Sequence, residues 1–201
     1  MTGKGGGGIA ITRSDNPITK SDRSKQMKAN KDHLGYVGRK PGSRNSNAWF
    51  TPNTYVNLVR KVLGDIDLDP FSCSSANRTI KARRFFCEKR SAFENEWNAK
   101  TVFMNPPYST GLISRSVDRF LEMRHRYHFT AIVLVNNATE TKWFQALLES
   151  AQAICFPNHR ISFETSDNKS SSGNTRGQAF FYFGQDQKLF TTIFSTIGVV
   201  L

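Results

Sequence analysis

Thr101-Val102-Phe103-Met104-Asn105-Pro106-Pro107-Tyr108 is the stretch that decides the fold, because it joins an apolar segment to an abrupt stop. Residues 101–104 are apolar and partly β-branched, as in a buried strand. The two prolines lack the backbone N–H that a sheet ladder needs, so the strand has to end before them. Ligands of open α/β sheets bind beyond the carboxyl ends of strands, and we therefore expect a ligand site at residues 105–108.

Helices and apolar strands alternate on both sides of this stretch. Residues 54–63 follow the cap pair Thr51-Pro52, place apolar side chains on one face and stop at Gly64, which predicts a helix. We expect further helices at residues 111–126 and 141–148, and strands at residues 66–68, 85–87, 101–104, 131–135, 153–156, 161–163 and 179–183. Residues 189–200 fit either a helix or a strand. The alternation predicts an α/β fold with a mostly parallel sheet and an antiparallel, hairpin-like C-terminal end.

The chain divides by composition near residue 47. Residues 1–47 are rich in Gly, Ser, Asn and Lys and lack apolar periodicity, so we expect a disordered arm. Residues 48–201 are expected to form one folded domain, which is long enough to bury a sizeable core.

Charge points to a polyanionic partner. The chain holds 28 Lys and Arg against 16 Asp and Glu, for a net charge of +12. Residues 1–47 contain ten basic and three acidic side chains, so the excess is concentrated in the arm. Nucleic acid is the natural partner of such a chain. The alternative is a basic arm that only keeps the protein soluble.

Several classes of protein are not expected. No apolar run approaches the roughly 18 residues that would span a bilayer, and the first residues lack a secretory stretch, so we predict a cytoplasmic protein without membrane contact. Cys73, Cys87 and Cys155 are too far apart for a metal site, and the four histidines do not complete one. We expect reduced, packing cysteines, no bound metal, and a monomer.

The tetrapeptide after the strand suits chemistry on an exocyclic amine. The lone pair of adenine N6 is delocalised into the ring, so a catalyst has to hold this amine while favouring its tetrahedral form. The Asn105 side chain and the Pro106 carbonyl can each accept an amine hydrogen, and Pro107 stiffens the loop. Tyr108 would then stack on the base. The alternative is a loop that only breaks the strand.

A second motif, Asp65-Ile66-Asp67-Leu68-Asp69-Pro70-Phe71-Ser72, places acids around a short strand. A carboxylate at a strand terminus can pair with the α-ammonium group or the ribose hydroxyls of S-adenosylmethionine, and Asp69 is the first candidate. An ordinary Asp-Pro turn is the alternative.

These motifs together resemble the phage-type DNA N6-adenine methyltransferase family (Dam-type), from Ala48 to about Gly184. The resemblance is carried by Trp49-Phe50-Thr51-Pro52, Asp67-Leu68-Asp69-Pro70-Phe71, Trp97, Val102-Phe103-Met104-Asn105-Pro106-Pro107-Tyr108-Ser109, Trp143-Phe144 and Arg160-Ile161-Ser162-Phe163. It implies a Rossmann-like methyltransferase fold, S-adenosylmethionine as methyl donor, adenine in DNA as substrate, and a phage or prophage setting such as restriction-modification.

The resemblance also implies functions for individual residues. It assigns catalysis to Asn105, Pro106, Pro107 and Tyr108, and cofactor binding to Thr51, Pro52, Asp67, Asp69, Pro70, Phe71 and Asn105. The glycine-rich loop typical of methyltransferases at large is absent after Pro70, where Phe71 and small residues stand instead. Glu88 is a candidate for the ribose hydroxyls if residues 85–87 form the second strand.

Candidate DNA contacts come from basic side chains. Lys81, Arg83, Arg84 and Arg160 can reach phosphates, or they can belong to a solvated face. Two other functions remain open: a methyltransferase that acts on RNA adenine or protein glutamine, which would keep the same tetrapeptide, and a catalytically inactive DNA-binding module.

Overall fold

The computed structural model describes residues 50–87, 91–108, 111–164 and 174–201, which all belong to one compact unit, His33–Leu201. The predicted arm, residues 1–47, lies outside the described residues. The described helices are α2 (Asn53–Leu63), α3 (Ser74–Ile80), α4 (Leu112–Tyr127), α5 (Lys142–Ser150) and α6 (Gln187–Phe194). The described strands are β1 (Leu68–Asp69), β2 (Arg84–Phe85), β3 (Thr101–Met104), β4 (Thr130–Asn136), β5 (Ala153–Pro157), β6 (Gln178–Phe183) and β7 (Gly198–Val200).

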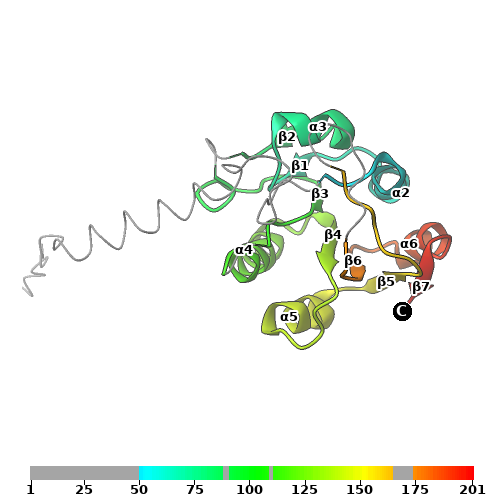
Figure 1. Ribbon diagram of the computed structural model, residues 1–201. Helices are drawn as coiled ribbons and strands as arrows, with labels where there is room; N and C mark the ends of the chain where they lie inside the picture. Colours follow the sequence, from blue (N-terminus) through cyan, green and yellow to red (C-terminus); the bar gives the residue numbers. More distant parts are fainter. Residues whose placement is uncertain (1–49, 88–90, 109–110, 165–173) are drawn as a thin grey trace, which may run out of the picture. The chain divides into compact units, whose positions relative to one another are not determined.

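These strands form one sheet in the order β2-β1-β3-β4-β6-β5-β7 (Figure 1). The first four strands run parallel, whereas β6 pairs antiparallel with both β4 and β5, and β7 pairs antiparallel with β5. It follows that β5 runs parallel to β4. The fold is therefore α/β as predicted, and its sheet is parallel in the first half and mixed in the second.

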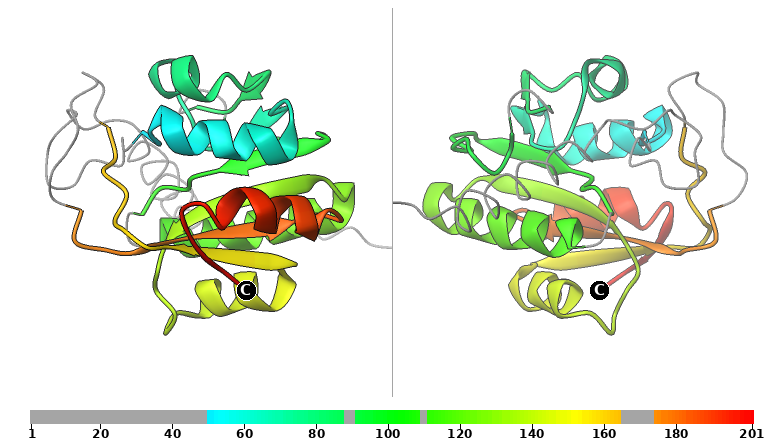
Figure 2. Two further views of the ribbon diagram at one scale, coloured as in Figure 1. Left: turned by 90° about the vertical axis from the view of Figure 1, so that its right-hand side faces the viewer. Right: turned by 60° about the vertical axis from the view of Figure 1, so that its left-hand side comes forward.

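Helices cover both faces of the sheet. In the left view of Figure 2, α2 and α6 lie in front of the sheet, while α4 and α5 lie behind it. β4 is buried along its length, and its alternating side chains divide between two cores: Ile132 and Leu134 join the core under α2 and α6, and Val133 and Val135 join the core under α4 and α5. This three-layer packing explains why β4 is a continuous apolar run.

Most predicted elements are present within a few residues. The helix after Thr51-Pro52 begins at Asn53, ends at Leu63 and is followed by Gly64 at φ 72°, a conformation that suits glycine. Residues 189–200, open between helix and strand, contain most of α6 and all of β7. The helix α3 has no counterpart among the predictions.

Two predictions about the C-terminal half need correction. Residues 161–163 do not form a strand; an isolated antiparallel bridge, between Phe50 and Glu164, follows them directly. β5 and β6 are antiparallel, as expected, but they are not a tight hairpin at the end of the sheet. β6 is inserted between β4 and β5, where its six buried residues have apolar neighbours on both sides. Its burial is the physical reason for the Phe-rich sequence.

The strand directions define two ends of the sheet. We call the side marked by Asp69, Asn105, Asn136 and Gln178 the carboxyl end, because β1, β3 and β4 finish there and β6, running oppositely, begins there. We call the side marked by Asp67, Arg83 and Lys100 the amino end, because β1, β2 and β3 begin next to these residues.

Candidate functional site

Asp69 is a buried carboxylate at the carboxyl end of β1. It is 4% exposed, and one carboxyl oxygen accepts a hydrogen bond from the Phe71 backbone N–H at 3.2 Å. Burial raises the pKa of Asp69 to about 7, although the Phe71 N–H and the Ser72 hydroxyl partly oppose this rise. A carboxylate in this setting is stabilised by a cation or by hydroxyl donors more strongly than it would be in water.

Asn105 follows β3, the strand next to β1. Its side-chain nitrogen Nδ2 donates to Thr51 Oγ1 at 3.2 Å. Thr51 is 3% exposed, so this contact joins a buried hydroxyl to a half-buried amide. The structure thus brings together two motifs that lie 54 residues apart in the sequence.

The segment that carries Thr51 is fastened on both sides. Phe50 and Glu164 exchange two backbone hydrogen bonds of 2.9 Å each, and Pro52 accepts the backbone N–H groups of Tyr55 and Val56 at the start of α2. In Figure 2 the chain after β5 runs back toward the beginning of α2, as this pairing requires. Thr51 is therefore held between a backbone bridge and a helix start.

Tyr108 is anchored by its hydroxyl. The Asn136 backbone N–H donates to the Tyr108 oxygen at 2.8 Å, and the hydroxyl lies 3.5 Å from the Leu134 carbonyl. Burial raises the pKa of Tyr108, while the Asn136 N–H and the positive charge of Arg176 act in the opposite direction. The hydroxyl is thus fixed at the end of β4, which restricts the positions the ring can take.

A buried glutamine connects this end of β4 with the loop after β5. Gln178 is 3% exposed; its amide nitrogen donates to Asn136 Oδ1 at 3.2 Å and its amide oxygen accepts the Ile161 N–H at 3.0 Å. Sequence reasoning missed Gln178 and Asn136. The available clue was one amide side chain directly before the apolar run of residues 179–183.

The remaining predicted residues of the catalytic and cofactor motifs pack at the same end of the sheet. Pro70, Pro106 and Pro107 are buried. Phe71 is 9% exposed and packs against Trp97 and Phe93, with ring centroids 5.8 and 5.5 Å away.

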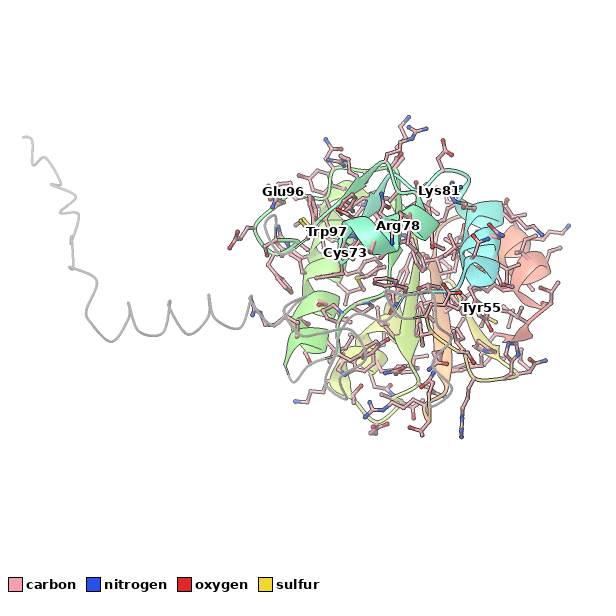
Figure 3. The ribbon with its side chains drawn as sticks, turned by 45° about the horizontal axis from the view of Figure 1, so that its top comes forward. Tyr55, Cys73, Arg78, Lys81, Glu96 and Trp97 are labelled. Atoms are coloured by element: carbon pink, nitrogen blue, oxygen red, sulfur yellow. The ribbon has the colours of Figure 1, made fainter. Side chains whose placement is uncertain are left out.

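Other predicted residues lie elsewhere. Asp67 is at the amino end, where its carboxylate accepts the Lys100 backbone N–H at 2.9 Å and pairs with Arg83 at 3.5 Å. Arg83 also pairs with Asp65 at 2.5 Å, and Arg84 donates to the Asn98 carbonyl. Lys81 follows α3 and its carbonyl accepts from Arg60 of α2; Figure 3 shows it beside α2. Glu88 lies outside the described residues.

Two exposed arginines do lie at the carboxyl end. Arg160 follows β5 and directly precedes Ile161, whose N–H is bound by Gln178. Arg176, which sequence reasoning did not select, comes two residues before β6, and its charge acts on the Tyr108 hydroxyl. Among the described residues, neither arginine forms an ion pair of 4.0 Å or less, in contrast with Arg83.

Two further features are absent from the described residues. They contain no group of three or more His, Cys, Asp or Glu side chains arranged to hold a metal ion. None of their helices is long and apolar enough to cross a membrane.

Comparison with known proteins agrees with the class that these motifs suggest. The family profile described as DNA N-6-adenine-methyltransferase (Dam) matches residues 40–198, and the chain therefore belongs to this family. The resemblance identified from the motifs is confirmed.

One relative of this chain is a phage protein. The chain is 28% identical over 116 residues to the DNA N-6-adenine-methyltransferase of Haemophilus phage HP1 (strain HP1c1). This match covers 57% of the chain and 65% of the relative, so it spans a little under two thirds of the relative's length.

Proposed function

We propose that this protein transfers a methyl group from S-adenosylmethionine to the N6 amine of adenine in DNA, on a Rossmann-like methyltransferase fold. The observation that carries the proposal is the position of Asn105-Pro106-Pro107-Tyr108. The tetrapeptide follows β3 at the carboxyl end of the sheet, and the buried Asp69 ends the neighbouring strand β1 at the same end. Family membership and the phage relative support the same activity.

The residues around Asp69 fit the proposed methyl donor. Bound S-adenosylmethionine supplies a sulfonium methyl group, together with an α-ammonium group and ribose hydroxyls. Asp69 is buried enough that its ionised form needs such a partner, and either group would provide one. Pro70 and Phe71 follow Asp69 directly in the chain. Thr51, Pro52, Asp67 and Glu88 stay predictions as cofactor contacts; the position of Asp67 at the amino end does not favour it.

Asn105 and Pro106 would hold the amine. The Asn105 Oδ1 and the Pro106 carbonyl each accept one N6 hydrogen, which directs the nitrogen lone pair away from the ring and toward the donor methyl. These bonds strengthen as the nitrogen gains positive charge in the transition state, so they accelerate the reaction rather than only binding the base.

Tyr108 would stack on the adenine. An adenine in duplex DNA has to leave the stack before its amine can reach the site, and an aromatic face stabilises the extruded base. The bond from the Asn136 N–H fixes the Tyr108 hydroxyl, so the ring would receive the base in a set position.

The DNA backbone would approach the carboxyl end of the sheet. Arg160 and Arg176 are exposed there, and cations beside the site can contact phosphates without reading sequence. Arg83 and Arg84, also predicted as DNA contacts, are engaged with Asp65, Asp67 and Asn98 at the amino end, which weakens their candidacy.

A direct test offers labelled S-adenosylmethionine with three substrates in parallel: bacterial genomic DNA that lacks adenine methylation, RNA, and a protein extract. We expect label in DNA, recovered as N6-methyladenine after digestion. Label only in RNA or in glutamine would identify one of the alternative methyltransferases. Binding to DNA without methylation of any substrate would favour the inactive DNA-binding module.

A further inference from the structure

Thr51 is a buried polar side chain whose role is not explained by the fold alone. It is 3% exposed and precedes α2, but it does not cap that helix, because Pro52 occupies the N-cap position. The hydroxyl instead reaches across to Asn105, the residue directly after β3, and accepts its Nδ2–H at 3.2 Å.

The direction of this hydrogen bond matters for the reaction. A carboxamide has one acceptor atom and one donor atom, and only the acceptor can take a hydrogen from an amine. Since Thr51 Oγ1 accepts from Nδ2, the amide oxygen Oδ1 points to the other side of the group. A carboxamide turned by 180° would present N–H groups to the target amine and repel it.

Thr51 is itself well placed to hold this orientation. The two bonds between Phe50 and Glu164 fix the backbone on one side, and the Pro52 carbonyl is bonded to the first turn of α2 on the other. α2 is anchored in turn by Val56 and Val59, which are fully buried against the sheet. A hydroxyl on so constrained a segment can hold a more exposed amide in place.

We infer that Thr51 is a positioning residue, which holds the Asn105 side chain in place through the amide nitrogen Nδ2. This inference rests on the proposed function. It differs from the prediction that Thr51 binds the cofactor, and the two roles can be separated by kinetics.

The main test compares Thr51→Val with Thr51→Ser. Valine keeps the shape but cannot accept a hydrogen bond, whereas serine keeps the hydroxyl. We expect Thr51→Val to lower kcat for DNA methylation by roughly tenfold, the effect of losing about one hydrogen bond, with the KM for S-adenosylmethionine unchanged. Thr51→Ser should retain a kcat close to that of the wild type. Thermal melting of each variant reports whether the fold is intact.

A double-mutant cycle gives the readout that a purely structural role would not move. If Thr51 acts through Asn105, adding Thr51→Val to Asn105→Ala should not lower single-turnover rates further. An equal loss in both backgrounds would overturn the inference.

Two other results would also overturn it. One is a wild-type kcat in Thr51→Val, or in Thr51→Ala if the valine variant does not fold. The other is a raised KM for S-adenosylmethionine with kcat unchanged, which would make Thr51 a cofactor contact. Failure of the proposed function looks different, because then the wild-type protein itself would not methylate adenine.

Discussion

Asp69 and Asp67 are two residues apart, yet they lie at opposite ends of β1 in opposite surroundings. At the carboxyl end, Asp69 is 4% exposed and its pKa is raised to about 7 by burial. At the amino end, Asp67 is engaged by the Lys100 N–H and by Arg83. The same contrast holds for cations, since Arg83 is ion-paired while Arg160 and Arg176 have no such pair among the described residues. At the amino end these charged groups pair with one another, whereas at the carboxyl end the proposed function supplies their partners from the bound ligands.

Replacing one asparagine at each end should give the largest difference, which is a difference in methylation rate. Asn105→Ala removes the acceptor for the amine in the transition state, so turnover should fall by orders of magnitude while S-adenosylmethionine and DNA still bind. Asn98→Ala makes the same change at the amino end, where this side chain is exposed, and should leave the rate unchanged. Rates measured with labelled donor would decide; near-normal methylation by Asn105→Ala would refute the mechanism.

The second largest effect should be a difference in cofactor affinity between variants of the two aspartates. Asp69→Asn should weaken S-adenosylmethionine binding by at least tenfold, since a charge-assisted contact contributes about 1.5 to 3 kcal/mol. Asp67→Asn should leave the affinity unchanged and lower stability by less than about 1 kcal/mol, as expected for a partly exposed ion pair. Calorimetric titration of both variants checks this. Equal losses of affinity would return Asp67 to the cofactor site.

Asp69 should also make stability depend on pH. In the unfolded chain the Asp69 carboxyl loses its proton near pH 3.8. In the folded protein the pKa of Asp69 is about 7, so the carboxyl keeps its proton up to a higher pH. The contribution of Asp69 to the stability of the cofactor-free protein therefore declines as the pH rises from about 4 to 7, and stays low above that.

Replacing the carboxylate should remove this loss. Above pH 7, Asp69→Asn should melt a few degrees higher than the wild type, which corresponds to about 1 kcal/mol in a domain of this size. The difference should shrink toward pH 4, and Asp67→Asn should show no such gain. A melting temperature for Asp69→Asn below that of the wild type at pH 8 would contradict the prediction.

The smallest effect is expected from the arginines. Replacing both Arg160 and Arg176 by Gln should weaken DNA binding and make the dependence of log K on log salt shallower by about two, if each contacts one phosphate. The matched pair Arg83→Gln and Arg84→Gln should leave the slope unchanged. A shallower slope in the Arg83 and Arg84 variants alone would indicate that DNA binds at the amino end of the sheet.

The sequence by itself determined the strand-and-tetrapeptide unit at residues 101–108, the α/β class and the family. The reason is local: an apolar run, a double proline and a helix with apolar side chains on one face each determine the backbone conformation within a few residues. For the same reason α2, β3 and β4 were predicted close to their observed bounds.

Only the tertiary structure decided how distant segments meet. No local pattern could place Thr51 against Asn105, insert β6 between β4 and β5, or bring Arg176 near Tyr108. The strand pattern favoured Asp69 over Asp67 for the cofactor, but it could not show that Asp69 is buried or that Asp67 is engaged by Arg83 and the Lys100 N–H. Their difference arises from burial and from which backbone N–H groups and cations surround each carboxylate, and these are set by strand order and direction.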